Sequence, residues 1–336
     1  MASIKDVAKR AGCSVTLVSR VINHQPGVSE EKRQIIEAAI KELGYTQNML
    51  ARSLVLKKTN TIGVVLDTLC EEYFFPLIEG IEDQIDKSGY DVLFCSARNS
   101  TRKKNNYISY FMKNRVDGII IYGSKLDDMD LIRRLVNAGF PFALIENDVG
   151  TLNANNILLN NEYGSALAVD HLFECGCRNI CYVAGESTMQ AAQRRQAGFV
   201  EAMKRHGISE KELLILDSGW TEEQGYGTFK NFLKKYGRKN LPDAFYFGSD
   251  QTAFGGMKAL TEAGISVPDE VMLVGFDDDK PRHHDFSYMP LTTIRQPLEE
   301  MGRAAVDILL DELNGKSTGK KKVMYYPTLV VRETTR

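Results

Sequence analysis

Apolar residues follow two different patterns along the chain. Over residues 1–45 they recur at helical spacing in three short stretches, and from residue 60 onward short β-rich runs alternate with amphipathic helical stretches. A first series of runs, "TIGVVL", "DVLFC", "DGIII" and "PFALI", begins at residues 61, 91, 117 and 141. A second series, "NICYVA", "LLILD", "DAFYF" and "VMLVGF", begins at residues 179, 213, 243 and 271. The pattern predicts a small all-α domain followed by an α/β core.

The order of strands and helices also predicts the architecture of the core. Helical stretches such as 77–87 and 251–262 separate the strands, and glycines such as Gly89 and Gly264 close them. Strand and helix alternation at these spacings forms right-handed βαβ units and parallel sheets. Two series of strands predict two similar lobes. Ligands bind beyond the carboxyl ends of such strands, so we expect a ligand cleft between the lobes.

The first 45 residues have the capping signals of three helices. The letters "SIKD" predict a capping box between Ser3 and Asp6, and Gly12 makes the turn after the first helix. Ser14 is placed to cap the second helix and Ser29 to cap the third. Two short helices around a tight turn, with a third in support, predict a helix-turn-helix unit. Its second helix would enter the DNA major groove with its N-terminus first.

The second helix carries side chains suited to reading DNA. Thr16 can hydrogen-bond a base edge, Val15 can contact a thymine methyl group, and Arg20 can bind guanine or phosphate. Residues 1–60 hold ten Lys and Arg against five Asp and Glu, a net charge of +5, which leaves −7 for the rest of a chain of net charge −2. A basic head on an acidic body indicates nucleic-acid binding by the head. The alternative interpretation of residues 1–45 is a pair of packed helices that does not bind DNA.

Motifs along the whole chain add a family resemblance. They are "IKDVAKRAGCSVTLVSRVIN", "VSEEKRQIIEAAIKELGY", "ARSL", "TNTIGVV", "RVDGIII", "VPDEVMLVGFDD", "PLTTIRQPLEEMGRAAVDILL" and "LVVRETT". With them the chain closely resembles the lactose-repressor (LacI/GalR) family of bacterial transcription regulators. The resemblance implies a sequence-specific repressor with a helix-turn-helix headpiece, a hinge helix and a two-lobed core like that of periplasmic binding proteins. It also implies a homodimer, or in some members a tetramer, on near-palindromic operator DNA.

The resemblance divides the chain into three parts. Residues 1–46 form the DNA-binding domain, 47–60 the hinge helix and linker, and 61–336 the effector-binding core. We expect the first lobe of the core to hold residues 61–160 and 292–318, and the second lobe residues 162–289 and 322–336.

The resemblance also implies which residues bind DNA. In the headpiece and hinge these are Ser14, Val15, Thr16, Leu17, Ser19, Arg20, Asn23, Ala51 and Leu54. The hinge is short enough to be marginally helical alone, so it can order when DNA and a partner hinge are present. In the family, the leucine matching Leu54 wedges into the minor groove, with the residue matching Ala51 nearby. Packing between domains is the other reading of Leu54. Family hinges often have proline where this chain has Gln47, which predicts a looser entry to the hinge.

Effector-contacting positions of the family map onto the core at Tyr73, Phe74, Arg195, Trp220, Asp250 and Asp277. The carboxylates of Asp250 and Asp277, which follow strands, can accept hydrogen bonds from ligand hydroxyl groups. The Arg195 guanidinium supplies hydrogen-bond donors in a fixed arrangement, and the Trp220 indole offers a face to a flat ligand or sugar ring. Ordinary core packing and a solvated ion pair are the alternatives. Glu146 and Asn147 are weaker candidates.

The residues just before Arg195 bear on the effector's identity. Family members that bind purines have polar contacts there, whereas this chain has Met189 and Ala191. We therefore expect a sugar or sugar derivative, with a nucleobase or a protein partner as alternatives. Both induction and corepression fit the sequence.

Other protein classes lack support. The sequence has no signal peptide or membrane-spanning run, so we expect a cytoplasmic protein. It has no P-loop, G-x-G-x-x-G, G-x-S-x-G or H-E-x-x-H motif, so we expect neither an enzyme nor a bound cofactor. "CGCRNIC" lacks a second zinc-ligand pair, and we expect buried thiols there; "HHD" at 283–285 is expected to be an exposed loop. A solute-binding protein without a DNA role is the competing hypothesis, which salt-dependent retention on DNA would discriminate.

Overall fold

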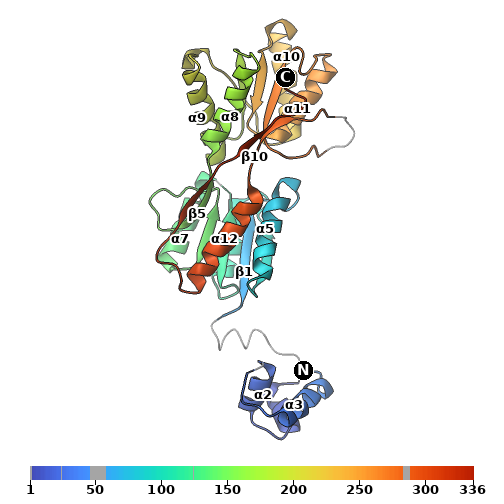
Figure 1. Cartoon of the computed structure of the whole chain (residues 1–336), viewed down its shortest axis with the longest axis vertical. Helices are drawn as coiled ribbons and strands as arrows, with labels where there is room; N and C mark the ends of the chain where they lie inside the picture. Colours follow the sequence, from blue (N-terminus) through green and yellow to red (C-terminus); the bar gives the residue numbers. More distant parts are fainter. Residues whose placement is uncertain (1, 24, 46–57, 124, 283–287) are drawn as a thin grey trace. The chain divides into compact units, whose positions relative to one another are not determined.

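The chain forms two compact units, which are described separately here. The computed structural model describes residues 2–23, 25–45, 58–123, 125–282 and 288–336 (Figure 1). The first unit is Met1–Thr59 and the second is Asn60–Arg336. The hinge positions Gln47, Ala51 and Leu54, and the "HHD" stretch at 283–285, lie outside the described residues.

Three helices form the headpiece, as the capping signals predict: α1 (Ile4–Arg10), α2 (Val15–Ile22) and α3 (Glu30–Glu42). Each begins at a serine whose hydroxyl accepts a backbone N–H, and α1 has the full capping box. The helices are too short to be stable alone, so they depend on a shared core around Val7, Val18 and Ile36, all fully buried.

The first core sheet has the strand order β11-β5-β4-β3-β1-β2, and every neighbouring pair is parallel. Its strands are β1 (Thr61–Leu66), β2 (Asp91–Ser96), β3 (Gly118–Tyr122), β4 (Phe142–Ile145), β5 (Asn155–Leu159) and β11 (Lys322–Tyr325). Its helices are α5 (Phe75–Asp86), α6 (Thr101–Phe111), α7 (Met129–Ala138) and α12 (Leu298–Leu313), with short turns η1 (Glu72–Phe74) and η2 (Leu126–Asp128). Strands β3 and β4 are buried along their whole length, as is typical of parallel sheets covered on both faces.

The second core sheet has the order β12-β10-β9-β8-β6-β7. Its strands are β6 (Ile180–Ala184), β7 (Leu214–Asp217), β8 (Ala244–Phe247), β9 (Met272–Asp277), β10 (Thr292–Arg295) and β12 (Thr328–Val330). Its helices are α8 (Asn161–Glu174), α9 (Gln190–Arg205), α10 (Glu222–Tyr236) and α11 (Asp250–Glu262), with short turns η3 (Glu210–Glu212) and η4 (Arg238–Asn240). Strand β12 runs antiparallel to β10, so this sheet is parallel except at one edge.

The expected lobe boundaries are wrong near the C-terminus. Residues 292–295 form β10, which pairs with β9 in the second sheet and not with the first lobe. Residues 322–325 form β11, which pairs with β5 in the first sheet and not with the second lobe. The chain passes between the lobes after β5, between β10 and α12, and between β11 and β12 (Figure 1). The last two passages lead to β11 and β12, which form edge strands of the first and second sheet respectively.

Helices α5 and α12 approach each other closely in the first lobe. A Cβ atom added to Gly80 would lie 2.1 Å from the carbonyl oxygen of Glu299, and one added to Gly302 would lie 2.5 Å from that of Leu77. The absence of side chains at these two glycines is therefore what allows the helix backbones to meet.

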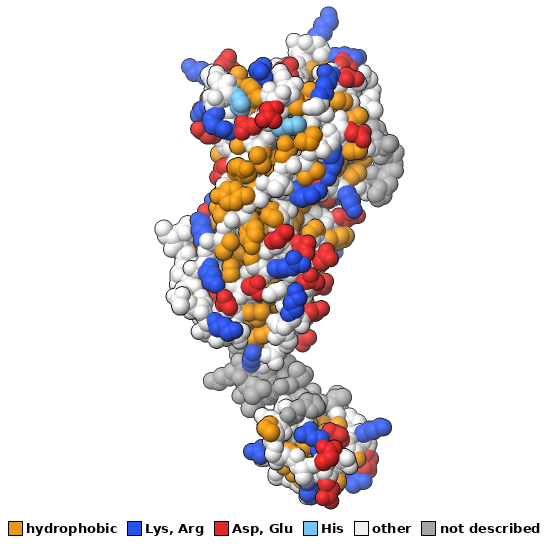
Figure 2. All heavy atoms as spheres, in the orientation of Figure 1, with side chains coloured by type: hydrophobic (Ala, Val, Ile, Leu, Met, Phe, Trp, Pro, Cys, Tyr) orange, Lys and Arg blue, Asp and Glu red, His pale blue; other side chains and the backbone are white. Residues whose placement is uncertain are grey.

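Charged side chains of both signs are scattered over the core surface in Figure 2, and apolar side chains gather along the middle of the face shown. The exposed large apolar residues of the core include Tyr163, Met324, Tyr326 and Val331. Cys177 and Cys181 are buried as expected, whereas Cys70 is exposed and Cys175 is half-buried. Among the described residues no helix is both long and apolar enough to cross a membrane.

Candidate functional site

The outer face of α2 carries the side chains expected to read DNA. Val15 is 40 % exposed, and Thr16 and Arg20 are also exposed near the start and end of the helix. Ser14 caps the helix by accepting a hydrogen bond from the backbone N–H of Leu17 at 3.2 Å. Leu17 itself packs partly against the headpiece core. Ser14 and Leu17 thus have structural roles in addition to the expected one.

Ser19 and Asn23 are engaged with each other at the end of α2. The side-chain amide of Asn23 donates to the carbonyl oxygen of Ser19 at 2.8 Å and to its hydroxyl at 3.3 Å. The Oδ1 atom of Asn23 is buried and has no hydrogen-bond partner within the described part of the chain. This pair closes the helix and leaves Thr16 and Arg20 as the more accessible polar groups.

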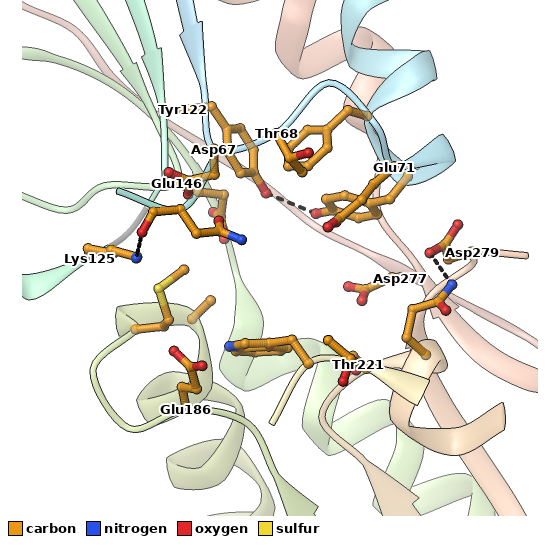
Figure 3. A pocket seen from close by; sticks show the side chains of 18 of the residues that line it. Asp67, Thr68, Glu71, Tyr122, Lys125, Glu146, Glu186, Thr221, Asp277 and Asp279 are labelled. Atoms are coloured by element: carbon orange, nitrogen blue, oxygen red, sulfur yellow. Dashed lines mark hydrogen bonds between the residues drawn. The ribbon is translucent and has the colours of Figure 1, made fainter. Parts of the chain in front are cut away.

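A cavity of about 410 Å³ opens in the core, and side chains from both lobes line it (Figure 3). Five of the six expected effector contacts lie in its wall: Tyr73, Phe74, Arg195, Trp220 and Asp277. The weaker candidate Glu146 lines it as well, and so do Met189 and Ala191. Asn147 is buried beside Glu146 without lining the cavity.

Arg195 and Asp277 form a buried ion pair at the cavity wall. The Nη1 atom of Arg195 donates to Oδ1 of Asp277 at 3.0 Å and to the carbonyl oxygen of Gly248 at 2.6 Å, while Nε donates to Asn161 at 2.9 Å. The guanidinium also lies 3.7 Å from the ring centroid of Phe276. These contacts fix the guanidinium plane, so Arg195 presents donors in a set orientation.

Asp277 combines an unusual backbone with an unusual charge environment. Its φ is +119°, a left-handed conformation that residues other than glycine rarely adopt. Burial raises the pKa of Asp277 to about 7, and the hydrogen bonds from Arg195 and Gln296 offset this only in part. Strain and a shifted pKa at one cleft residue are typical of a functional position.

Asp250 does not line the cavity, contrary to the expectation from the family. Its carboxylate is fully buried, accepts a hydrogen bond from the Thr293 hydroxyl at 2.6 Å and accepts another from the backbone N–H of Asp279 at 2.8 Å. Burial raises its pKa well above the ordinary value. Asp250 is the first residue of α11, and its carboxylate holds the loop that follows β9.

Aromatic side chains form two opposite parts of the cavity wall. The Tyr73 hydroxyl lies 3.0 Å from that of Tyr122, and Phe74 packs edge-on against Tyr122 at 5.0 Å between ring centroids. On the side of the second lobe, Trp220 fits against Gly185, where a Cβ atom would lie 2.6 Å from the indole ring. The Nε1 atom of Trp220 is buried with no hydrogen-bond partner among the described residues. A ligand acceptor would satisfy it.

A buried charge network supports the first-lobe wall. Lys104 is fully buried and lies 3.1 Å from Asp67 and 2.6 Å from Asp128. Burial alone would lower the pKa of Lys104, but the two carboxylates raise it overall. Gly123, with φ +123°, leaves the room that Asp67 and Lys104 occupy. The network fixes Asp67, which lines the cavity.

Polar contacts join the two lobes around the cavity. The guanidinium of Arg282, from the second lobe, lies 2.9 Å from Glu71 of the first. Arg194 of α9 lies 2.6 Å from Asp148, which follows β4. The backbone N–H of Leu126 donates to the carbonyl oxygen of Thr188 at 3.2 Å. The structure therefore shows the lobes in contact on more than one side of the cavity.

Carboxylates outnumber cations in the cavity wall. The acidic lining residues are Asp67, Glu71, Glu146, Glu186, Asp277 and Asp279, and the basic ones are Lys125, Arg195 and Arg282. Figure 3 shows Tyr122 and Glu71 on one side of the cavity, Thr221 and Glu186 on the other, and Asp277 between them. Sequence reasoning missed Asp67 and Tyr122, although both stand at the carboxyl ends of predicted strands.

Comparison with known proteins matches the headpiece and the core to two different family models. Residues 3–48 match the family described as bacterial regulatory proteins, lacI family, and residues 169–335 match the periplasmic binding protein-like domain. Over 100% of its length the chain is 33% identical to the HTH-type transcriptional repressor PurR of Haemophilus influenzae, with 99% of that protein covered.

Two solved structures resemble the whole chain. The lac repressor dimer bound to operator and the anti-inducer ONPF has a TM-score of 0.84 at 29% identity, covering 99% of this chain and 98% of that one. The complex of the transcriptional regulator CelR with cellobiose has a TM-score of 0.74 at 26% identity, covering 99% and 100%. The chain belongs to the lacI family of bacterial regulatory proteins, and it is a DNA-binding transcriptional repressor rather than an enzyme.

Proposed function

We propose that the chain represses transcription as a homodimer on a near-palindromic operator and that a small neutral molecule, a sugar or sugar derivative, controls it from the core cavity. The observation that carries the effector proposal is the Arg195–Asp277 pair in a cavity wall where carboxylates predominate. Ionised carboxylates accept hydrogen bonds from hydroxyl groups, and a guanidinium donates hydrogen bonds to hydroxyl oxygens, which together match a polyol.

The charge of the cavity narrows the effector class. Six carboxylates against three cations repel a phosphate or another anionic group, so a sugar phosphate or nucleotide fits less well than a neutral sugar. Trp220 adds an indole face, and its unpaired Nε1 can donate to a ring or hydroxyl oxygen. The relative CelR, solved with cellobiose, is similar over the whole chain and supports the same class.

A purine is the second candidate. Relatives named PurR match the full length of the chain, and the aromatic pair Tyr73 and Phe74 stands in the cavity wall where a flat ring could pack. Against it, Met189 and Ala191 give the wall hydrocarbon surface where purine-binding members have polar contacts. Neither thioether nor methyl group can pair strongly with the edge of a nucleobase.

A thermal-shift screen tests the effector proposal. The purified full-length protein is screened against neutral sugars, disaccharides, sugar phosphates and nucleobases, since a ligand of the folded state raises its melting temperature by mass action. We expect a shift with a neutral sugar and none with its phosphate. Loss of the shift in Asp277→Ala would assign the hit to this cavity. A shift with nucleobases alone would replace the sugar proposal by the purine one.

The DNA-reading face is tested separately. Operator sequences are first selected from random duplexes with the full-length protein, and the affinities of Thr16→Ala and Arg20→Ala are then measured for the selected site and for unrelated DNA. We expect each change to weaken specific binding by about five- to a hundredfold, the equivalent of one good base contact. Lys41→Ala on α3 is the control for loss of a positive charge. Equal losses for Arg20→Ala and Lys41→Ala on both DNAs would reduce Arg20 to a general electrostatic role.

Coupling between the two sites is the last part of the proposal. The lobes touch through Glu71–Arg282 and Asp148–Arg194, so an effector that favours one arrangement of the lobes changes the state of the core to which the hinge is attached. Such couplings typically amount to about 1–3 kcal/mol. Operator affinity measured with and without the effector gives both the size of the coupling and its sign.

A further inference from the structure

A second cavity, of about 530 Å³, borders the effector cavity. It is bordered by η1 and the start of α5, by the loop after β9, and by the passages of the chain between the lobes at 296–297 and 326–328. Tyr73, Asp277 and Asp279 line both cavities. The two cavities therefore share a wall, and that wall contains the ion-paired carboxylate of the effector site.

Gln296 is the buried polar residue of the second cavity. It is 5% exposed, and its Nε2 atom donates to Oδ1 of Asp277 at 2.7 Å. Its Oε1 atom is buried and has no hydrogen-bond partner among the described residues. The bond to the Asp277 carboxylate fixes which end of the amide is the nitrogen, so the unpaired atom is an acceptor. A buried acceptor left unpaired is unfavourable, and a donor entering the cavity would satisfy it.

The charges around this cavity favour a cation as that donor. The carboxylates of the wall are Glu72, Asp277, Asp278, Asp279, Glu299 and Glu300, whereas its cations are Lys280 and Arg295. Arg295 is already paired with Asp278 at 2.6 Å, and the mostly exposed Lys280 lies 4.0 Å from Glu72. The N-terminus of α12, the positive end of the helix dipole, borders the cavity. Glu299 and Glu300 in the first turn of the helix offset that partial positive charge. Asp277 is paired with Arg195, Asp278 with Arg295 and Glu299 with Arg303. Glu300 has no ion pair among the described residues, so Glu300 and the loosely paired Glu72 are the carboxylates most open to an added cation.

We propose that the second cavity binds a small organic cation bearing primary ammonium groups, which donates to Gln296 Oε1 and to the carboxylates of Glu72 and Glu300. An ammonium group carries three donors and no acceptor, which matches a wall whose available groups are acceptors. Because Gln296 bonds the same oxygen of Asp277 as Arg195 does, a cation held there borders the effector site without entering it.

Isothermal titration of the full-length protein with putrescine tests this site. Its neutral analogue 1,4-butanediol, at the same ionic strength, is the control for size and hydrogen bonding. We expect putrescine to bind and the diol to give no heat. Glu300→Gln should weaken putrescine binding by about tenfold, the loss of one charge-assisted hydrogen bond. Glu79→Gln removes an exposed carboxylate from α5, outside the cavity, and should leave the affinity within twofold.

Two further outcomes would overturn the proposal. The effector cavity is also acidic, so Trp220→Ala, which alters that cavity alone, is titrated in parallel. Loss of putrescine binding in Trp220→Ala with full binding in Glu300→Gln would place the amine in the effector cavity. Equal weakening by Glu300→Gln and Glu79→Gln would show attraction to the acidic surface and no defined site. Circular dichroism of each variant shows whether it is folded.

Discussion

Asp277 owes its properties to three constraints acting on one residue. Its backbone is left-handed, its carboxylate is buried, and Arg195 and Gln296 both donate to Oδ1. The guanidinium of Arg195 favours the charged form of the Asp277 carboxyl, whereas burial favours its neutral form. Burial is the larger effect, so the pKa of Asp277 is raised to about 7. The protonation state of the effector site therefore changes within the range of pH in which bacterial proteins are usually studied.

We expect effector affinity to rise with pH because of Asp277. The ionised carboxylate is the better acceptor for a ligand hydroxyl, and the ionised fraction of a group with a pKa near 7 grows about tenfold between pH 6 and 8. Titration calorimetry across this range should follow that rise, and Asp277→Asn should give a weaker but flat profile. A wild-type profile as flat as that of Asp277→Asn would contradict the role given to ionisation.

The same shift has a consequence for the stability of the effector-free protein. Since the pKa of Asp277 is raised in the folded state, its contribution is favourable at low pH and is lost as pH rises through about 7. Thermal melts between about pH 5 and 8 should show this loss, and Asp277→Asn should reduce it.

Gly185 makes room for Trp220, and we expect Gly185→Ala to weaken effector binding. A methyl group there would lie 2.6 Å from the indole ring and push it toward the cavity. Gly227→Ala is the matched control, because a Cβ at Gly227 meets no atom within 4 Å. An effector affinity unchanged by Gly185→Ala would mean that the position of the indole does not matter to the ligand.

The family resemblance predicted cavity residues better than the local pattern did. It pointed to Arg195 in α9, Trp220 after β7 and Asp277 at the end of β9, and these side chains do line one cavity. Asp250 looked the same in sequence, but its place at the first position of α11 directs it inward to Thr293. Tyr122 was missed because it ends a fully apolar strand and reads as core. Position along a strand is visible in sequence, whereas the direction of a loop side chain depends on tertiary contacts.

The contact between α5 and α12 is the clearest element-scale constraint. We expect Gly80→Ala to destabilise the core by about 1–3 kcal/mol, since its methyl group would overlap a backbone carbonyl that cannot rotate away. Gly227→Ala, inside α10 and free of contacts, should instead stabilise by about 1 kcal/mol through helix propensity. Chemical denaturation of both variants measures the difference. Similar effects of the two changes would show that the helices can separate without cost.

Eight of the twelve strands in the described part of the core follow from the apolar pattern alone. The four that were missed, β5, β10, β11 and β12, lie beside the passages between lobes, and β12 has only three residues. Short strands leave too few positions for a periodic pattern to show. Their partners also come from distant parts of the chain, as in the pairing of β11 with β5. The lobe boundaries therefore depended on pairings that local pattern does not contain.

At the scale of the whole core, the contacts across the cleft set how the lobes respond to a ligand. Arg194 and Asp148 pair across the lobes without lining the effector cavity. We expect Arg194→Gln to weaken effector affinity by up to about fivefold, because it removes a contact of the lobe arrangement seen here. Arg205→Gln breaks a pair with Asp170 that lies within the second lobe, and should have no effect. Unchanged affinity in Arg194→Gln together with weakened affinity in Arg205→Gln would show that the contact between the lobes does not contribute to effector binding.

The number of chain passages between parts has a consequence for how such proteins diversify. One stretch of chain joins the headpiece to the core, so a single genetic crossover near residue 60 could exchange operator specificity and keep the effector site intact. The lobes are joined by three passages, so exchanging one lobe between relatives requires three joins made at once. Recombination should accordingly mix headpieces with cores far more readily than lobe with lobe, and new effector specificities should arise mainly by point substitution in the cavity wall.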